Sequence, residues 1–329
     1  MKVVDMHCDT IAELYERRKQ GSKETILENN LHLDLRKMRQ GDYGLQNFAL
    51  FTCLEQTEHP FEHAMKLADL FFQELEQHQD LIGIVTSYEE IEKNWKEGRM
   101  SALLTLEEGG VCQGKLEFLR QFYRIGVRMM TLTWNYPNEL GYPNKIIMDG
   151  PMAGTCMPDT EHGLTETGIA FVQEMERLGM IIDISHLNDA GIWDVFHYTK
   201  KPLVASHSNA RALASHPRNL TDEMIRTLAE RGGVAGINYC GDFLHDWNGE
   251  PSKSLISHMV EHMKHMKQIG GTEVIGLGSD FDGIGGDLEL RNGADLPLLE
   301  QEMTKQGFTR SEIEAVFFKN VLRVYREVL

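Results

Sequence analysis

Short apolar runs alternate with longer amphipathic stretches along most of the chain. Nine runs have the length and apolar content of buried strands; they begin at Val3 and cover 46–52, 81–86, 101–106, 127–134, 180–186, 202–208, 233–239 and 273–283. Patterns typical of helices occupy 10–20, 59–79, 88–98, 115–124, 163–178, 189–199, 221–231, 252–268, 295–305 and 309–327. This alternation predicts a parallel sheet that is covered by helices.

A single (β/α)8 barrel is the α/β fold that we expect, because 329 residues suit one such domain. A barrel closes with eight strands, so one of the nine runs must be peripheral. We expect this to be 81–86, since it alone is not followed by a polar residue with an evident chemical role. No internal repeat, low-complexity tract or linker interrupts the chain, which predicts one catalytic domain over 1–329. The Gly- and Pro-rich loop 135–162 has a length that is typical of functional loops.

The net charge makes some classes of binding partner unfavourable, and the cysteine pattern indicates the state of the thiols. A formal net charge of −17 disfavours binding to nucleic acid or to an anionic membrane. No apolar run reaches the length of a membrane helix, and no basic-then-apolar leader precedes the first strand, so we expect a cytoplasmic protein. The five widely spaced cysteines include no CxxC motif, which favours reduced thiols over a disulfide framework.

Residues suited to metal binding and acid–base chemistry follow five of the predicted strands. They are His7 and Asp9, Glu107 and Glu108, His186, His207 and Asp280. His7 and Asp9 are two positions apart, so an extended chain directs both side chains to one face. The carboxyl ends of all strands of a barrel meet at one face, where the active sites of such barrels lie. The sequence therefore predicts that these residues converge.

The donor set indicates a hydrolytic metal centre. Three histidines and several carboxylates are too many for one tetrahedral ion with an open position, and they suit two ions that share a carboxylate. Ligands without thiolate favour zinc, with manganese, iron or cobalt as alternatives. Two such ions can hold a hydroxide and polarise an amide or ester carbonyl, with Asp280 as the acid–base group. Glu107 and Glu108 compete as the bridge, because strand alternation lets only one face the centre.

Stretches distributed over nearly the whole chain resemble the membrane (renal-type) dipeptidase family, peptidase family M19, among the amidohydrolase-type metal barrels. They are DMHCDT, LEEGG, MTLTW, LGMIIDISHLN, VASHSNAR followed by RNL, GSDFDG and KNVLRVYREVL. The resemblance implies a dipeptidase with two zinc ions, which hydrolyses dipeptides of the form L-Xaa-L/D-Xaa with a metal-bridged hydroxide. Members of the family are often dimers, so the resemblance also suggests a homodimer.

The resemblance implies roles for individual residues. Five would bind the metals: His7 and Asp9 one zinc ion, Glu108 both ions, and His186 and His207 the second ion. Asp280, the first Asp of GSDFDG, would be the proton shuttle. Asp282 is the alternative carboxylate of the same motif, and we interpret it as a structural one. Arg218 would hold the C-terminal carboxylate of the substrate, a bidentate task that suits arginine, with Arg211 in reserve.

The chain departs from the family pattern at one position. The renal enzymes carry a histidine after the TLT of the fourth strand, which contacts the substrate carbonyl, and Trp134 stands there in this chain. Either Asn135 or Asn138 takes over this contact, or the metals alone activate the carbonyl. Trp134 and Asn135 are therefore the candidate substrate-binding residues of this segment.

Two other classes of protein are compatible with these residues. One is a metal-dependent hydrolase of a lactone or cyclic amide. Several barrels of that kind bridge their metals with a modified lysine, whereas the candidate bridge here is a glutamate and no lysine stands at the end of a core strand. The other is a binding protein that keeps metals without catalysis, which would have no use for Asp280 or Arg218. The residues favour the dipeptidase.

Overall fold

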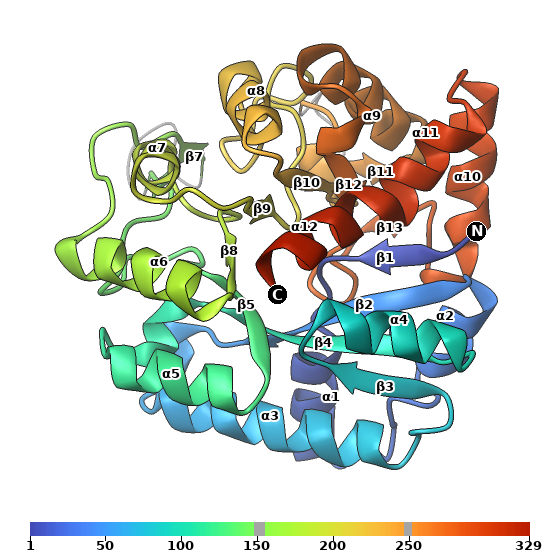
Figure 1. Cartoon of the computed structure of the whole chain (residues 1–329), viewed down its shortest axis with the longest axis horizontal. Helices are drawn as coiled ribbons and strands as arrows, with labels where there is room; N and C mark the ends of the chain where they lie inside the picture. The colour runs from blue at the N-terminus through green and yellow to red at the C-terminus, as the bar shows by residue number, and fades with distance from the viewer. Residues whose placement is uncertain (148–154, 247–251) are drawn as a thin grey trace.

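Eight parallel strands close into a barrel in the computed structural model, which describes residues 1–147, 155–246 and 252–329 (Figure 1). In order around the barrel they are β1 (Val3–Asp5), β2 (Tyr43–Phe51), β4 (Met100–Glu107), β5 (Val127–Thr131), β8 (Ile181–Asp183), β9 (Val204–Ala205), β10 (Val234–Ile237) and β12 (Ile275–Leu277). The pairing of β1 with β12 completes the ring. The predicted (β/α)8 barrel is confirmed.

A ninth strand, β3 (Ile82–Val85), lies outside the ring. It pairs with the first half of β4, from Met100 to Leu103, while β5 pairs with the second half, from Leu104 to Glu107. The other edge of β4 pairs with β2 along most of its length, ending at Phe51 opposite Glu107. The prediction that 81–86 is peripheral is confirmed.

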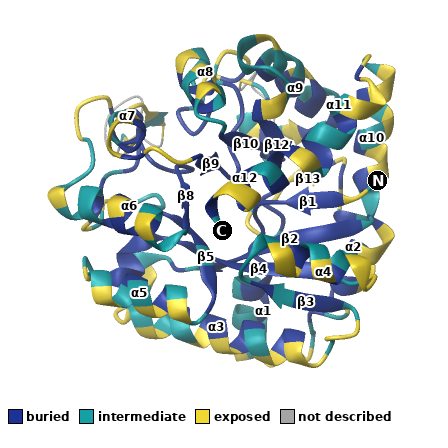
Figure 2. Ribbon diagram, in the orientation of Figure 1, coloured by how far each residue is buried: buried dark blue, intermediate teal, exposed yellow. Residues whose placement is uncertain are grey.

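Helices surround the barrel and present their apolar faces to it (Figures 1 and 2). They are α1 (Thr10–Lys19), α2 (Leu35–Gln40), α3 (Pro60–Glu76), α4 (Tyr88–Lys96), α5 (Leu116–Arg124), α6 (Glu166–Leu178), α7 (Asp189–Tyr198), α8 (Asp222–Glu230), α9 (Ile256–Gly270), α10 (Leu296–Lys305), α11 (Arg310–Glu314) and α12 (Asn320–Val328). In α3 the buried residues Ala64, Leu67, Phe71 and Leu75 recur at helical spacing. The sequence pattern missed the short α2, and a π-helical turn, Ala315–Lys319, divides the predicted helix 309–327.

The last helix closes the amino end of the barrel. Side chains of α12, including Val321 and Tyr325, pack against inward-facing strand residues such as Leu103 and Val204. The hydroxyl of the fully buried Tyr325 meets the side-chain amide of Asn47, on β2, at 2.7 Å. Figure 1 shows α12 across the middle of the ring. With this end filled, the carboxyl end of the barrel is the one left open for a site.

Within the described residues, two small sheets lie outside the barrel. One pairs β6 (Lys145–Ile146) with β7 (Cys156–Met157) within the predicted loop 135–162, of which 148–154 lie outside the described residues. The other pairs β11 (Lys253–Ser254) with β13 (Asp287–Leu288). Of the helices that the structure describes, none has the length and apolar character needed to cross a membrane.

Candidate active site

The predicted metal-binding residues converge at the carboxyl end of the barrel. Glu107 is the last residue of β4, and the others follow their strands by two to four positions: His7 and Asp9 after β1, His186 after β8 and His207 after β9. None of these five residues is more than 8% exposed. Glu107, Asp9 and His186 also line a cavity of about 820 Å³. Residues 200 positions apart are therefore neighbours, as the barrel requires.

Glu107 lies at the centre of the cluster. Its Oε2 is 3.1 Å from Nε2 of His7, and its Oε1 is 3.0 Å from Nε2 of His186 and 3.8 Å from Nε2 of His207. On the other side, Oδ2 of Asp9 is 3.4 Å from Nε2 of His7. Among the described residues, three groups of potential ligands result. Glu107 belongs to two of them, His7–Asp9–Glu107 and Glu107–His186–His207, and the third is His7–His207–Asp280.

The structure corrects the expected bridge, because Glu108 points away from the histidines. Its carboxylate accepts hydrogen bonds from the backbone of Gly110 and Trp134, at 2.6 and 2.9 Å, and from the amide of Asn138. The cause is strand alternation: Leu103 belongs to the inner cluster, so every second residue up to Glu107 faces inward. Glu108 has left the strand with φ at +105° and caps the turn that follows.

The ring nitrogens of two histidines face one another. Nε2 of His186 and Nε2 of His207 are 2.9 Å apart. Nδ1 of His207 lies 2.7 Å from the hydroxyl of Ser206, which donates its own proton to Asp183. The Ser206 hydroxyl must therefore accept a proton from Nδ1 of His207, so its Nε2 carries a lone pair directed into the cluster. Such a second contact fixes a metal-binding tautomer.

Burial and crowding perturb the pKa values of the cluster. Burial, reinforced by the carboxylate of Asp9, raises the pKa of Glu107 to about 8. Burial alone would lower the pKa of His7, but the carboxylates of Glu107 and Asp9 outweigh it, so that the pKa is well above its usual value. Burial and neighbouring positive groups hold the pKa of His186 and of His207 well below the usual value.

These features fit a site for divalent cations. Nε2 of His7 is buried and makes no hydrogen bond with any described residue, although it faces two carboxylates. Gly283 leaves the site space, since a Cβ there would lie 2.2 Å from Oδ2 of Asp9 and 2.6 Å from Oδ1 of Asp280. Crowded carboxylates and neutral imidazoles with inward lone pairs are the donor set that zinc prefers.

Asp280 borders the cluster on the same cavity. Its Oδ1 is 3.9 Å from Nε2 of His7, and its Oδ2 accepts a hydrogen bond of 2.9 Å from Asn238. Burial, with a further contribution from Asp9, raises its pKa to about 6. Asp282 instead accepts hydrogen bonds from the hydroxyl of Thr10 and the backbone of His32, which fits its expected structural role.

Arg218 lines the same cavity and has unused donors. It is 8% exposed, and its Nε and Nη2 have no hydrogen-bond partner among the described residues. Arg211 is the alternative candidate for binding the substrate carboxylate. Its guanidinium is already paired, because it donates two hydrogen bonds of 2.7 Å to the carboxylate of Asp189. A buried guanidinium without a counter-ion is energetically unfavourable, so this position favours binding of an anion that the chain itself does not supply.

The segment after β5 supplies one wall of the cavity. The indole of Trp134 packs at 4.9 Å against the ring of Phe51 and at 5.7 Å against that of Tyr136. Asn135 lies beside it and contacts His186, whereas Asn138 binds Glu108 and lines no part of this cavity. Trp134 and Asn135 both face the cavity.

Sequence reasoning missed the residues that hold these side chains in place. Asp183 ends β8 and is fully buried, and it binds Thr131, Ser206 and the backbone of Ser185. Asn238 holds Asp280 from the end of β10. In the sequence, Asp183 and Asn238 are marked only by being polar residues at the end of an apolar strand. The predicted ligands share this feature.

The backbone is strained where the site is built. Among the described residues, six other than glycine have a left-handed φ, and four of them are Glu108, His186, Asp280 and Asp282. Each such residue costs on the order of 1–3 kcal/mol and persists only where its surroundings enforce it. The concentration of strain at the strand ends is typical of a functional site.

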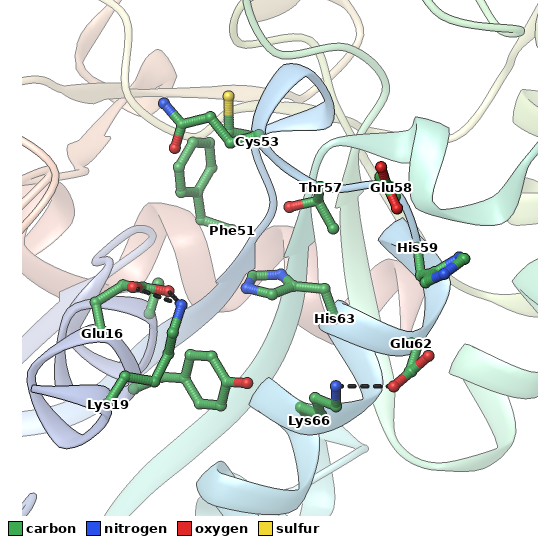
Figure 3. A pocket seen from close by; sticks show the side chains of 13 residues that line it. Glu16, Lys19, Phe51, Cys53, Thr57, Glu58, His59, Glu62, His63 and Lys66 are labelled. Atoms are coloured by element: carbon green, nitrogen blue, oxygen red, sulfur yellow. Dashed lines mark hydrogen bonds and ion pairs between the residues drawn. The ribbon is translucent and has the colours of Figure 1, made fainter.

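A second pocket of about 560 Å³ adjoins the cavity between α1 and α3 (Figure 3). The two spaces share Ala12, Glu16 and Phe51. The ring of His63 projects into this pocket, where two ion pairs line the wall: Glu16 with Lys19 at 2.9 Å and Glu62 with Lys66 at 2.8 Å. These charges are largely exposed and paired with one another, so the pocket lacks the buried donor set of the cluster.

The fold and the cluster together define a metal-dependent hydrolase barrel. A sequence profile of the membrane dipeptidase family, peptidase family M19, matches residues 1–329. The chain therefore belongs to this family and is a metallo-dipeptidase, as the resemblance of its motifs implied.

Two relatives are similar to most of the chain. An uncharacterized dipeptidase of Schizosaccharomyces pombe is 32% identical over 99% of this chain and 80% of its own length. An uncharacterized protein from the pqqA 5′ region of Klebsiella pneumoniae is 35% identical over 73% of this chain and 86% of its own length.

Solved structures share the fold. A metallopeptidase of Rhodobacter sphaeroides, liganded with a phosphinate mimic of the dipeptide L-Ala-D-Ala, superposes with a TM-score of 0.88 at 23% identity, over 100% of this chain and 99% of its own. A dipeptidase described as a metallopeptidase of family M19 has a TM-score of 0.88 at 24% identity, over 100% and 98% of the two chains.

The position of the shared carboxylate can be tested by metal binding. We expect Glu107→Gln to weaken metal binding at least 100-fold, since even contacts behind a ligand contribute 10- to 100-fold. Glu108→Gln should keep the metals and lower the free energy of unfolding by about 1–3 kcal/mol, because its amide would face backbone donors. Metal content after dialysis against a chelator and denaturant titration measure both effects. The exposed Glu117→Gln is the control, and loss of metal from Glu108→Gln alone would restore Glu108 as the ligand.

Proposed function

We propose that the chain is a binuclear zinc dipeptidase that acts on dipeptides of the form L-Xaa-L/D-Xaa. The observation that carries the proposal is that two groups of potential metal ligands share Glu107. His7 and Asp9 would hold one ion, His186 and His207 the other, and Glu107 both. Bound there, two ions would supply an activated water and polarise the peptide carbonyl.

Arg218 supports a substrate with a free carboxylate. Its guanidinium is buried beside the cavity and lacks an anionic partner among the described residues. A dipeptide whose reacting carbonyl lies at the cluster would bring its C-terminal carboxylate within one residue of that carbonyl. Pairing these charges compensates the burial of both, which favours a dipeptide over an uncharged lactone or cyclic amide.

Asp280 is the group that would move the proton. It borders the cluster without standing at its centre, and Asn238 fixes one of its oxygens. This leaves Oδ1 to take a proton from the attacking water and deliver it to the departing amine nitrogen. The peptide bond breaks as the amine leaves, and the new carboxylate stays with the N-terminal residue.

The Rhodobacter sphaeroides metallopeptidase was crystallised with a mimic that has a D-residue at its C-terminal position. This supports acceptance of a D-residue at that position in the present chain.

A panel of dipeptides tests the proposed reaction. We expect the metal-loaded protein to release free amino acids from L,L and L,D dipeptides, to lose this activity with a chelator and to regain it with zinc, because the ions supply the nucleophile. Liquid chromatography of the products measures the release. Turnover of lactones or cyclic amides with none of dipeptides would show a different hydrolase, and a metal-loaded protein inert toward both would be a binding protein.

Asp280→Asn should separate chemistry from metal binding. We expect kcat to fall 10²- to 10⁴-fold, since a general acid–base group contributes that much, while two metals stay bound. Atomic absorption and steady-state kinetics measure the two properties. Asp282→Asn serves as the matched carboxylate and should lower stability with at most a few-fold change in kcat. Undiminished turnover by Asp280→Asn would assign the proton transfer to another group.

Arg218→Met should impair recognition of the carboxylate. We expect kcat/KM for dipeptides to fall at least 30-fold, because removing one partner of a buried charge pair costs about 2 kcal/mol or more. The same substitution should have little effect on dipeptide amides, which lack the charge. If both substrate classes lost activity equally, Arg218 would act on the fold or on the cluster instead.

A further inference from the structure

The pocket between α1 and α3 adjoins the cavity that holds the cluster. Ala12, Glu16 and Phe51 line both spaces. Ala12 and Glu16 belong to α1, and Phe51 is the last residue of β2. The pocket has a volume of about 560 Å³. A molecule bound in the cavity can therefore extend a side chain past these residues into the space between the two helices.

The order of the strands indicates which part of a dipeptide faces this pocket. Arg218 follows β9, and its guanidinium carbon lies 5.5 Å from the ring centre of Phe243, which follows the neighbouring β10. β2, which ends in Phe51, stands four positions away from β9 in the ring of strands, and is thus across the barrel. A dipeptide with its carboxylate at Arg218 and its reacting carbonyl at the cluster therefore directs its N-terminal residue toward β2 and the pocket.

His63 is held from behind by Thr52. The backbone N–H of Thr52 donates to the carbonyl of Glu107 at 3.4 Å, so this contact lies next to the cluster. The hydroxyl of Thr52 is buried and is 3.1 Å from Nδ1 of His63, its one hydrogen-bond partner among the described residues. A buried hydroxyl proton without an acceptor is costly, so Thr52 donates to Nδ1.

The second ring nitrogen of His63 is a free donor. Burial lowers the pKa of the ring, with smaller and opposing contributions from nearby charges, so the imidazole is neutral at pH 7. Because Nδ1 accepts from Thr52, the proton of the neutral ring resides on Nε2. The ring projects into the pocket (Figure 3), and no described residue accepts a hydrogen bond from Nε2. A ligand in the pocket can therefore supply the acceptor.

The charged residues of the pocket disfavour a further charge. Two ion pairs line the wall, Glu16 with Lys19 at 2.9 Å and Glu62 with Lys66 at 2.8 Å. A lysine or glutamate side chain entering this space would have to break one pair or remain unpaired. A carboxamide oxygen can accept from Nε2 of His63 and leaves both pairs intact.

We infer that the pocket between α1 and α3 binds the N-terminal side chain of the dipeptide and selects a long, uncharged side chain that ends in a hydrogen-bond acceptor, as in glutamine. The inference rests on the proposed function. The methylene groups of this side chain pack along Ala12 and Phe51, and His63 donates to its terminal oxygen. These contacts are the same in the ground state and the transition state, so they lower KM and leave kcat nearly unchanged.

Five dipeptides with a common C-terminal alanine test the selectivity of the zinc-loaded protein. Their N-terminal residues are L-Gln, L-Met, L-Ala, L-Lys and L-Glu, and methionine matches the length of glutamine without its amide. We expect kcat/KM for Gln-Ala to exceed that for Ala-Ala by about 10-fold or more. It should exceed that for Met-Ala by about 3- to 10-fold, the effect of one hydrogen bond, and the difference should lie in KM. Lys-Ala and Glu-Ala should be poorer substrates than Gln-Ala.

Two variants separate the end group from the length of the side chain. In His63→Leu the ratio of kcat/KM for Gln-Ala to that for Met-Ala should fall to about one, because the donor is lost. In Ala12→Leu the advantage of both over Ala-Ala should fall about 10-fold, because the larger side chain narrows the entrance. Ala170→Leu, at a half-buried position of α6 that lines neither space, should keep the ratios of the parent. Each ratio is taken within one variant, so a loss of folded protein cancels.

The outcomes distinguish this inference from the proposed function. If the parent hydrolyses Ala-Ala and Gln-Ala equally well, the pocket does not select the side chain. A preference for Lys-Ala or Glu-Ala over Gln-Ala, or one for Gln-Ala that both variants retain, also overturns the inference. If the parent hydrolyses no dipeptide, the proposed function fails. Calorimetry with phosphinate mimics of Gln-Ala and Met-Ala then decides the selectivity of the pocket, and equal binding of the two contradicts it.

Discussion

The carboxylate of Glu107 is the feature on which the site depends. The pairing of β2 with β4 ends with Phe51 opposite Glu107, so closure of the barrel itself carries this side chain to the centre of the carboxyl end. There it lies within 4 Å of three imidazoles, with the carboxylate of Asp9 close by. Burial raises its pKa to about 8. A bound cation would reverse this, because positive charge favours the ionised carboxylate, so a bound metal and the geometry of the site would stabilise each other.

The amino end of the barrel contributes stability, and the carboxyl end carries the residues suited to chemistry. At the amino end α12 fills the opening with apolar side chains, and its Tyr325 meets Asn47. At the carboxyl end the strands stop early: β8 and β9 have three and two residues, and His186 and His207 stand beyond them. Short strands free the backbone to take the left-handed conformation of His186. The core at the other end offsets the cost of this strain.

The sequence pattern was sufficient to predict the barrel, the peripheral strand and the convergence of the candidate ligands. A parallel barrel requires apolar runs that alternate with helices, and it brings the polar residues at the strand ends to one face. It could not choose between Glu107 and Glu108. In a strand buried on both faces, the odd- and the even-numbered positions are both apolar, as Leu103 and Leu104 illustrate. Periodicity therefore does not say which set of positions points into the barrel. The register of β4 with its neighbours decides this, and that register depends on residues far away in the sequence.

The same limit applies to the contacts behind the ligands. Nδ1 of His186 meets Asn135 and Nδ1 of His207 meets Ser206, and the two partners come from different parts of the chain. Ser206 stands next to its histidine, whereas Asn135 is 51 residues away and reaches His186 only because β5 and β8 are neighbours. Motifs identify candidate ligands because binding of a metal constrains such residues locally. Residues that orient ligands are constrained only through space, and the barrel allows them to come from any adjacent loop.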